Sequence, residues 1–417
     1  MAEIKVYGTC SDRFIKVKQK LQENLSTGRD LGASICININ GQTVVDIWGG
    51  FADSKRTKPW GENTIATLWS TTKNVASLAT LILIDRGILD PEEKVCTYWP
   101  EFGVKGKENV QVKHFLSHTS GLSGWVEPVT VDDVFDVVKA TRLLEQQAPL
   151  WLPGTQSGYH ALTMGFLLGG LIHRVTGKTI GQFIADEITT PLKADFQLGV
   201  KQQDIPRVAE MILPPPPPPT PDNTPLPAAF SDPTSVMFRT FMNPPLDPSV
   251  ANNNPTWRTA ELAAANGHSN AKAITRILST ISLGGTVNGI KLLSPETIDK
   301  IFVEQSNGQD LALGKAVRFG LGYGIASPTQ DRDTLPNWIP AGKIASWGGL
   351  GGSLAVMDRD RGLTFGYVMN KMEHVAFPGD LDENGVQKTD RQREYIALTY
   401  EALDVGGIVL VGTGGLA

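Results

Sequence analysis

The sequence predicts an α/β protein, of the α+β type, whose antiparallel sheet is built from both ends of the chain. Two hairpins indicate the sheet. Residues 33–48 alternate apolar with small or polar side chains on either side of Asn40-Gly41, a pair typical of a type I′ turn. Residues 353–369 show a similar pattern around Asp360-Arg361-Gly362. The chain between the hairpins has mostly helical spacing, which indicates a mainly helical domain inserted into the sheet domain.

Helical periodicity marks five segments: residues 14–25, 71–86, 161–175, 261–283 with an interruption near Gly267, and 390–403. Gly87 and Gly177 follow two of them, as expected of helix ends. We therefore predict a discontinuous sheet domain over residues 1–75 and 285–417 and a helical domain over residues 76–284. The cleft between two such domains is where a ligand site is expected.

Two segments stand apart from this organisation. Residues 214–219 are an unbroken proline run with further prolines up to Pro227, so this part must be extended chain. We interpret residues 214–227 as a surface excursion of the helical domain, with a docking site for a proline-binding module as the alternative. The apolar tail at 406–412 is compatible with an edge strand or an oligomer contact, and the oligomeric state stays open.

Composition excludes several function classes. Among 417 residues, 41% are hydrophobic and 19% charged, as in an ordinary soluble globular protein. A net charge of −5 gives no reason to expect nucleic acid or an anionic membrane surface as a partner. The start of the sequence lacks a secretory signal, no apolar stretch is long enough to span a membrane, and the expected location is cytoplasmic.

Cysteine and histidine usage gives no sign of a disulfide framework, a metal or a cofactor. Cys10, Cys36 and Cys96 are widely spaced and odd in number, and Cys-x-x-Cys does not occur. The one His-x-x-x-His spacing, His114 to His118, we interpret as packing or hydrogen-bonded residues. We therefore expect no bound metal and no cofactor.

The most informative motif is Ser70-Thr71-Thr72-Lys73, at the start of a predicted apolar helix. Residues three apart on a helix share a face, so a lysine there can take the proton of the serine hydroxyl and activate it for acyl transfer. The spacing alone is weak evidence, because Ser269-Asn270-Ala271-Lys272 has it too. We interpret Ser269 as a helix cap.

Two further segments follow the first motif in an informative order. Tyr159 lies just before an apolar helix, in the segment 153–161, and a tyrosine can shuttle protons for such a pair. Residues 346–352 are rich in glycine at the opening of the last hairpin, where the backbone can approach a ligand closely and offer N–H groups to an oxyanion.

With these three elements in order, the chain resembles the serine β-lactamase and penicillin-binding-protein superfamily. It looks most like class C β-lactamases, the family VIII carboxylesterases and the lovastatin-type transesterases. Residues 112–122 resemble the "LLxHTSGL" segment of that superfamily, Val175-Thr176-Gly177 its "VTG", and Pro191-Leu192 its "PLG", with Lys193 in place of the glycine. The likeness covers nearly the whole chain and implies a β-lactamase-like fold.

The resemblance also implies roles. Ser70 is expected to be the nucleophile, with Lys73 and Tyr159 as general base and acid, and the backbone N–H groups of Ser70 and Leu350 as the oxyanion hole. Candidates for substrate contact are Trp347, Gly348, Gly349, His160, Trp125 and Tyr323. We interpret His114 and His118 as packing or hydrogen-bonded residues beneath the motif loop, and Trp69 as buried.

Two departures from the family pattern narrow the substrate. Ala161 stands where β-lactamases usually have an asparagine that holds the antibiotic amide. Trp347 stands where they usually have a lysine that holds the substrate carboxylate, and tryptophan offers an apolar wall instead. Both favour a serine carboxylesterase acting on small, neutral, hydrophobic esters.

Three alternatives remain open. The first is a transesterase that passes the acyl group to a secondary-metabolite alcohol. The second is a β-lactamase or D-amino-acid peptidase. The third is an inactive binding or scaffold protein of the same fold that acts through its proline run.

Overall fold

The computed structural model describes residues 4–214, 228–245, 247–248, 253–329, 334–373 and 390–405. The predictions for the apolar tail and for the proline run after Pro214 lie outside these residues.

One large sheet joins the two ends of the chain, as predicted. Within the described residues it has ten strands in the order β1-β3-β2-β15-β14-β13-β11-β10-β12, with β9 paired to β10. All neighbours are antiparallel except β10 and β12. The strands are β1 (Val6–Cys10), β2 (Gly32–Ile39), β3 (Gln42–Gly50), β9 (Ser306–Gln309), β10 (Ala316–Phe319), β11 (Gly324–Ile325), β12 (Thr334–Leu335), β13 (Ile344–Gly348), β14 (Leu354–Asp358) and β15 (Leu363–Met369).

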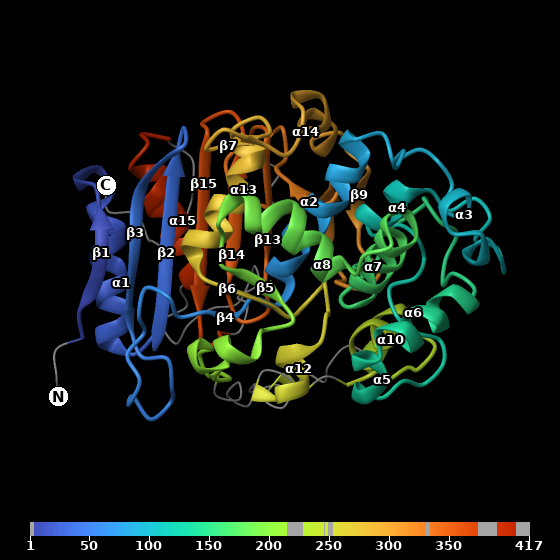
Figure 1. Cartoon of the computed structure of the whole chain (residues 1–417), viewed down its shortest axis with the longest axis horizontal. Coiled ribbons are helices and arrows are strands. Elements are labelled where there is room, and N and C mark those ends of the chain that lie inside the picture. The colour runs from blue at the N-terminus through green and yellow to red at the C-terminus, as the bar shows by residue number, and fades with distance from the viewer. Residues whose placement is uncertain are drawn as a thin grey trace.

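Both predicted hairpins are confirmed. β2 and β3 turn at Asn40 and Gly41, whose φ angles of 48° and 84° are the left-handed pair that a type I′ turn requires. β14 and β15 form the second hairpin, and β15 pairs with β2, which brings the early and late parts of the chain together in the middle of the sheet (Figure 1).

Helices cover both faces of the sheet, so its central strands are buried. α13 (Ala271–Ser282) packs across β2, β14 and β15. α1 (Ile15–Thr27) packs on β1 and β3, and α15 (Arg391–Glu401) packs on α1. The buried carboxylate of Asp30 accepts hydrogen bonds from Tyr367 of β15 at 2.7 Å and Tyr395 of α15 at 2.6 Å, which ties the last helix to the sheet.

The helix predicted over residues 261–283 is wrong in its first part. Residues 267–269 form a strand, β6 (Gly267–Ser269), between β4 (Ala66–Thr67) and β5 (Phe196–Leu198). A side chain at Gly267 would collide with Phe196 at 2.7 Å, and this close packing favours the strand over helical propensity. The helix cap is Asn270, which accepts from the Ala273 N–H at 2.9 Å, and not Ser269.

The central helix is α2 (Thr72–Asp85), which follows the short 3₁₀ turn η2 (Trp69–Thr71). Its side chains are buried almost throughout, because it packs between the sheet side of the molecule and α7 (Thr163–Thr176) and α8 (Ile180–Ile184). Most strands of the sheet lie on the left of Figure 1 and most helices on the right, and α2 lies between β13 and α7 in this view. The predicted division into two domains stays a prediction, and the packing of α13 on the sheet favours a boundary before that helix.

The remaining elements are short: α3 (Val95–Tyr98), α4 (Val112–Leu116), α5 (Val131–Phe135), α6 (Val137–Gln146), α9 (Thr190–Leu192), α10 (Val236–Phe241), α12 (Pro255–Thr259), α14 (Pro295–Ile301), β7 (Thr286–Val287) and β8 (Ile290–Lys291). In the part of the chain that the structure describes, no helix is both long and apolar enough to cross a membrane.

Candidate active site

Ser70 lies in η2, directly ahead of the buried helix α2. Its neighbours Trp69 and Thr71 are buried, whereas Ser70 itself is partly exposed. Trp69 has a left-handed φ of 47°, a conformation that costs a bulky residue about 1–3 kcal/mol and that recurs at functional sites. The Trp69 ring packs on Trp257 with centroids 5.0 Å apart, which helps to hold this turn in place.

Lys73 is the buried partner of Ser70. Its Nζ lies 3.0 Å from Ser70 Oγ, 2.7 Å from the Ala161 carbonyl oxygen and 2.9 Å from that of Ala264. Its side chain is enclosed by protein, and no carboxylate of the described residues forms a salt bridge with it. Burial therefore lowers the pKa of Lys73 well below its ordinary value, because the charged form loses its hydration.

Tyr159 faces the same pair from the segment ahead of α7. The Lys73 ammonium position lies 4.8 Å from the centre of the Tyr159 ring, and the Trp347 Nε1–H donates to the Tyr159 hydroxyl at 3.0 Å. Burial raises the pKa of Tyr159 above its ordinary value, although hydrogen bonding to Ser70 and Trp347 opposes the shift. Tyr159 is therefore held in its protonated form.

The glycine-rich segment after β13 lies against the turn that carries Ser70. A side chain at Gly349 would meet the Leu68 carbonyl oxygen at 2.1 Å, so only glycine allows this approach. Ser353 Oγ donates to the same carbonyl at 2.7 Å. Leu350 follows Gly349 in the chain, and its backbone N–H has no hydrogen-bond acceptor among the described residues. This placement supports the predicted oxyanion hole, which remains a proposal.

Apolar side chains surround Tyr159. It forms a buried cluster with Ala312, Val317 and Phe319. Six partly exposed residues pack against this cluster from α10, β12, β13 and the positions just after Tyr159 and Asp310: Ala161, Val236, Phe241, Leu313, Leu335 and Trp347. The wall beside the Ser70–Lys73 pair is therefore apolar, and the indole of Trp347 is part of it.

Three predicted substrate contacts lie inside the protein. Trp125 is in the core, donating to the Ala140 carbonyl oxygen at 3.0 Å. Tyr323 donates to the Asn74 carbonyl oxygen at 2.9 Å beneath α2. His160 is fully enclosed, with both ring nitrogens hydrogen bonded. Because none of the three presents a surface to a ligand, we leave them out of the proposed substrate site. Trp347, Gly348 and Gly349 remain in it; Trp347 and Gly348 are partly exposed, and Gly349 is buried.

Three positions beside the site carried no motif and were missed. Ser353 holds the glycine segment to η2, since its Oγ also contacts Thr71 Oγ1 at 2.9 Å. Asn74 donates to the Trp347 carbonyl oxygen at 3.2 Å and so links α2 to β13. Asp310 accepts from the Tyr159 N–H at 2.9 Å. All three act across more than 150 residues of sequence, a distance over which no local pattern gives a signal.

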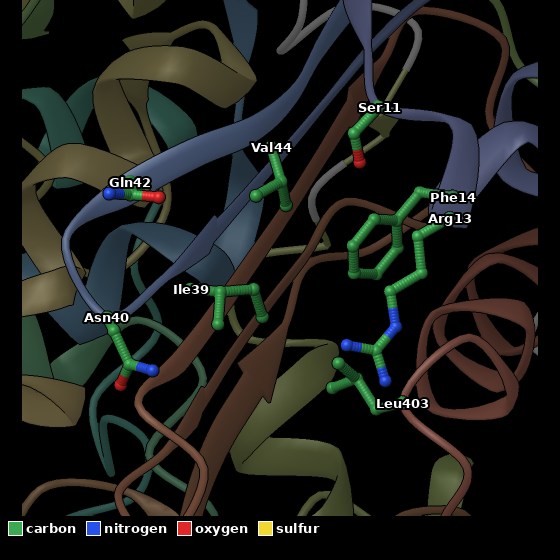
Figure 2. Close-up of a pocket in the computed structure, with 8 residues that line it drawn as sticks. All are labelled: Ser11, Arg13, Phe14, Ile39, Asn40, Gln42, Val44 and Leu403. Atoms are coloured by element: carbon green, nitrogen blue, oxygen red, sulfur yellow. The ribbon is translucent and has the colours of Figure 1, made fainter.

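A pocket of about 370 Å³ opens near the turn between β2 and β3, bordered by Phe14, Ile39 and Leu403 among others (Figure 2). It is distinct from the site around Ser70, because β2 is three strands away from β13 in the sheet. Among the described residues that line it, only Arg13 is charged, and it pairs with Asp404 at 3.4 Å.

Comparison with known proteins identifies the class. A family profile described as Beta-lactamase matches residues 17–387, so the chain belongs to the beta-lactamase family. It is an enzyme family with a serine-hydrolase fold, and esterases are among its members.

Individual relatives agree with this class. The chain is 32% identical to the esterase/beta-lactamase LipL of Mycobacterium tuberculosis, over 90% of this chain and 87% of that protein. The crystal structure of a family VIII carboxylesterase matches with a TM-score of 0.84 and 30% identity, over 95% of this chain and all of the other. A penicillin-binding-protein homologue from Caulobacter crescentus matches with a TM-score of 0.81 and 33% identity, over the same shares.

Proposed function

We propose that this protein is a serine carboxylesterase that cleaves small, neutral, hydrophobic esters through an acyl-enzyme on Ser70. The observation that carries the proposal is the contact of 3.0 Å between Ser70 Oγ and the buried Lys73 Nζ, which has no carboxylate partner among the described residues. A buried amine of lowered pKa is a base, whereas an ion-paired surface lysine is not.

Lys73 is proposed as the general base in acylation. Its two carbonyl acceptors, Ala161 and Ala264, each take one N–H and so fix the direction of the amine. When Lys73 is neutral, its lone pair is directed at the third neighbour, Ser70 Oγ. The Ser70 proton passes to Lys73 as the oxygen attacks the ester carbonyl. The N–H groups of Ser70 and Leu350 are proposed to stabilise the resulting oxyanion.

Tyr159 is proposed as the general acid. Its oxygen accepts the Trp347 Nε1–H at 3.0 Å, so its own proton is free to point toward Ser70 and the leaving oxygen. The raised pKa keeps that proton on Tyr159 until an alkoxide forms. An indole donor differs from the ammonium that the family usually has here, since it adds no positive charge that would favour a tyrosinate.

The apolar wall supports the substrate class. Ala161 and Trp347 offer a methyl group and an indole where β-lactamases usually have an amide and an ammonium. The cluster around Tyr159 extends this surface through Phe241, Leu313 and Leu335. Burying an acyl chain on it contributes about 0.8 kcal/mol per CH₂, so activity is expected to rise with chain length until the space is filled.

The decisive test is labelling with a p-nitrophenyl alkylphosphonate, which mimics the ester and traps the serine. We expect one adduct per chain, at Ser70 by peptide mass spectrometry, and no adduct in Ser70→Ala. Absence of labelling at Ser70, or full esterase activity in Ser70→Ala, contradicts the proposal. A series of p-nitrophenyl esters of increasing chain length then measures the acyl preference.

A second candidate activity is slow β-lactam hydrolysis, because the similar protein LipL is named as both an esterase and a beta-lactamase. Trp347 and Ala161 lack the groups that hold the carboxylate and amide of an antibiotic. We therefore expect nitrocefin turnover far below ester turnover, and rapid nitrocefin turnover would reverse this ranking. Acyl transfer to an alcohol is distinguished by product analysis with an ester donor and candidate alcohols.

A further inference from the structure

The backbone N–H groups around Tyr159 are held by residues outside its own segment. Residues 157–160 are neither helix nor strand, so they make no regular backbone hydrogen bonds of their own. Instead the Gly158 N–H donates to the His118 carbonyl oxygen at 2.9 Å, and the Tyr159 N–H donates to Asp310 Oδ1 at 2.9 Å. The His160 N–H donates to His118 Nδ1 at 3.0 Å. Three consecutive amides are thus held by two residues distant in sequence.

His118 supplies two of these acceptors because of its backbone conformation. Its φ is 60°, in the left-handed region that residues other than glycine rarely adopt. In this conformation its carbonyl oxygen and its ring nitrogen both face the 158–160 segment. The imidazole also packs against the Tyr159 ring, with centroids 4.9 Å apart, and against Phe319 at 4.7 Å. His118 therefore contacts Tyr159 at its ring and holds the residue on each side of it.

The hydrogen bonds determine the tautomer of His118. A backbone N–H can only donate, so Nδ1 must carry a lone pair and the ring proton must be on Nε2. Protonation at Nδ1 would remove the acceptor. Burial, together with the nearby His160 and Lys73, lowers the pKa of His118 well below its ordinary value and keeps the ring neutral.

Asp310 holds the middle amide and joins it to the apolar wall. Its fully buried Oδ1 also accepts from the Ala312 N–H at 3.0 Å and the Leu313 N–H at 2.9 Å. The other oxygen, Oδ2, has no partner among the described residues. Leu313 packs in the cluster around Tyr159, so one carboxylate oxygen positions both Tyr159 and a part of the proposed substrate wall.

We propose that His118 and Asp310 are positioning residues for Tyr159: the neutral His118, through Nδ1 and its carbonyl oxygen, and Asp310, through Oδ1, place the Tyr159 hydroxyl for proton donation to the leaving group. This rests on the proposed role of Tyr159 as general acid. His118 and Asp310 act through Tyr159, and neither is proposed to touch the substrate.

The test compares two esters that share an acyl group and differ in the leaving group. A p-nitrophenolate leaves without being protonated, whereas an alkoxide needs a proton from the general acid. The ratio of kcat/KM for p-nitrophenyl butanoate to that for ethyl butanoate therefore measures only the contribution of the general acid. Partial unfolding of a variant cancels in this ratio, because both esters see the same folded fraction.

The variants at His118 separate the acceptor from the backbone. His118→Gly permits the left-handed φ but has no side-chain acceptor, and His118→Asn permits it and places an oxygen where Nδ1 was. Both lose the imidazole ring. We expect the ratio to rise about tenfold in His118→Gly and to stay within about threefold of the parent in His118→Asn. Equal ratios in the two variants contradict the acceptor role.

Asp310 provides a second, independent set. Asp310→Ala removes the acceptor for Tyr159 and is expected to raise the ratio about tenfold, while Asp310→Asn retains an oxygen and raises it less. Tyr159→Phe is the reference and should raise the ratio most. If Tyr159→Phe leaves the ratio unchanged, the general-acid role of Tyr159 fails, while the serine esterase proposal is tested separately by labelling of Ser70. If Tyr159→Phe raises it but His118→Gly and Asp310→Ala do not, the positioning role alone is wrong.

Discussion

The two Ser-x-x-Lys segments of this chain have the same spacing and opposite surroundings. Lys73 is enclosed, contacts Ser70 Oγ at 3.0 Å and, among the described residues, has only uncharged acceptors in hydrogen-bond reach. The side chain of Lys272 is 40% exposed and pairs with Asp46 at 2.8 Å and Glu62 at 3.0 Å. Burial lowers the pKa of Lys73, whereas the hydrogen bonds to its carboxylate partners raise the pKa of Lys272. The same pattern therefore gives the proposed base in one place and an ion-paired, charged lysine in the other.

Local structure explains why only one pair meets. Ser70 lies in a 3₁₀ turn that runs directly into α2, so residues 70 and 73 share a face. Ser269 ends strand β6, and its hydroxyl donates to the Asp195 carbonyl oxygen at 2.7 Å, away from Lys272. Spacing of three residues brings two side chains together only where helical geometry continues between them.

The largest expected difference between the two segments is at the serines. Ser70→Ala removes the proposed nucleophile and is expected to lower kcat/KM for p-nitrophenyl butanoate by about 10⁴-fold or more. Ser269→Ala loses one hydrogen bond to a carbonyl and should keep its activity, with a cost of about 1 kcal/mol in the free energy of unfolding. Steady-state kinetics and urea titration measure both. Equal activities in the two variants would show that Ser70 is not the nucleophile.

The lysines are expected to differ nearly as much. Lys73→Met removes the proposed base and should lower kcat/KM about 10²–10⁴-fold, whereas Lys272→Met breaks only surface ion pairs and should stay active. Lys73→Arg is equally informative, since a guanidinium cannot act as a base near neutral pH. Substantial activity in Lys73→Arg would show that Lys73 is not the base.

The lowered pKa of Lys73 sets the direction of the pH dependence. Above that pKa the amine is neutral and can accept the Ser70 proton, and as the pH falls through it the amine becomes charged. We therefore expect kcat/KM to decrease toward acid pH along a limb that Lys272→Met leaves in place, because Lys272 is charged throughout this range. A shift of that limb in Lys272→Met would contradict the separation of the two lysines.

Trp347 is expected to have a smaller effect. Trp347→Phe keeps an aromatic wall but removes the Nε1–H that donates to Tyr159, and we expect about a tenfold loss of kcat/KM for ethyl butanoate, whose leaving group needs a proton. Because the change acts on Tyr159 orientation, the loss should appear mainly in kcat. A loss confined to KM would assign Trp347 to substrate binding alone.

The smallest effects concern the serines that hold each segment in place. Ser353 Oγ contacts the Leu68 carbonyl oxygen and Thr71 beside the first segment, and Ser34 Oγ accepts from the Ala271 N–H at 3.2 Å beside the second. Replacing either by alanine should cost about 1–2 kcal/mol of unfolding free energy in urea titration. Only Ser353→Ala should also lower kcat, by a few fold. An equal effect of Ser34→Ala on kcat would show that the site depends on global stability.

Most of the fold could be predicted because its signals are local. Both hairpins and the helices at 14–25 and 71–86 follow from periodicity and turn residues within about 15 residues of chain. The prediction failed at residues 261–270. There β6 is formed by pairing with strands near residues 66 and 196, and Gly267 packs too closely against Phe196 to carry a side chain.

The sequence by itself determined which candidate catalytic residues are present: a Ser70–Lys73 pair at a helix start, a tyrosine ahead of a helix, and glycines after a late strand. It also showed the two departures, Ala161 and Trp347. Only the tertiary structure decided that Lys73 is buried with no carboxylate partner in the part of the chain that the structure describes, that Trp347 donates to Tyr159, and that Asp310 and His118 hold the Tyr159 segment. The physical reason is that pKa values and hydrogen-bond partners depend on which distant residues exclude water and supply acceptors, and these are brought together by folding.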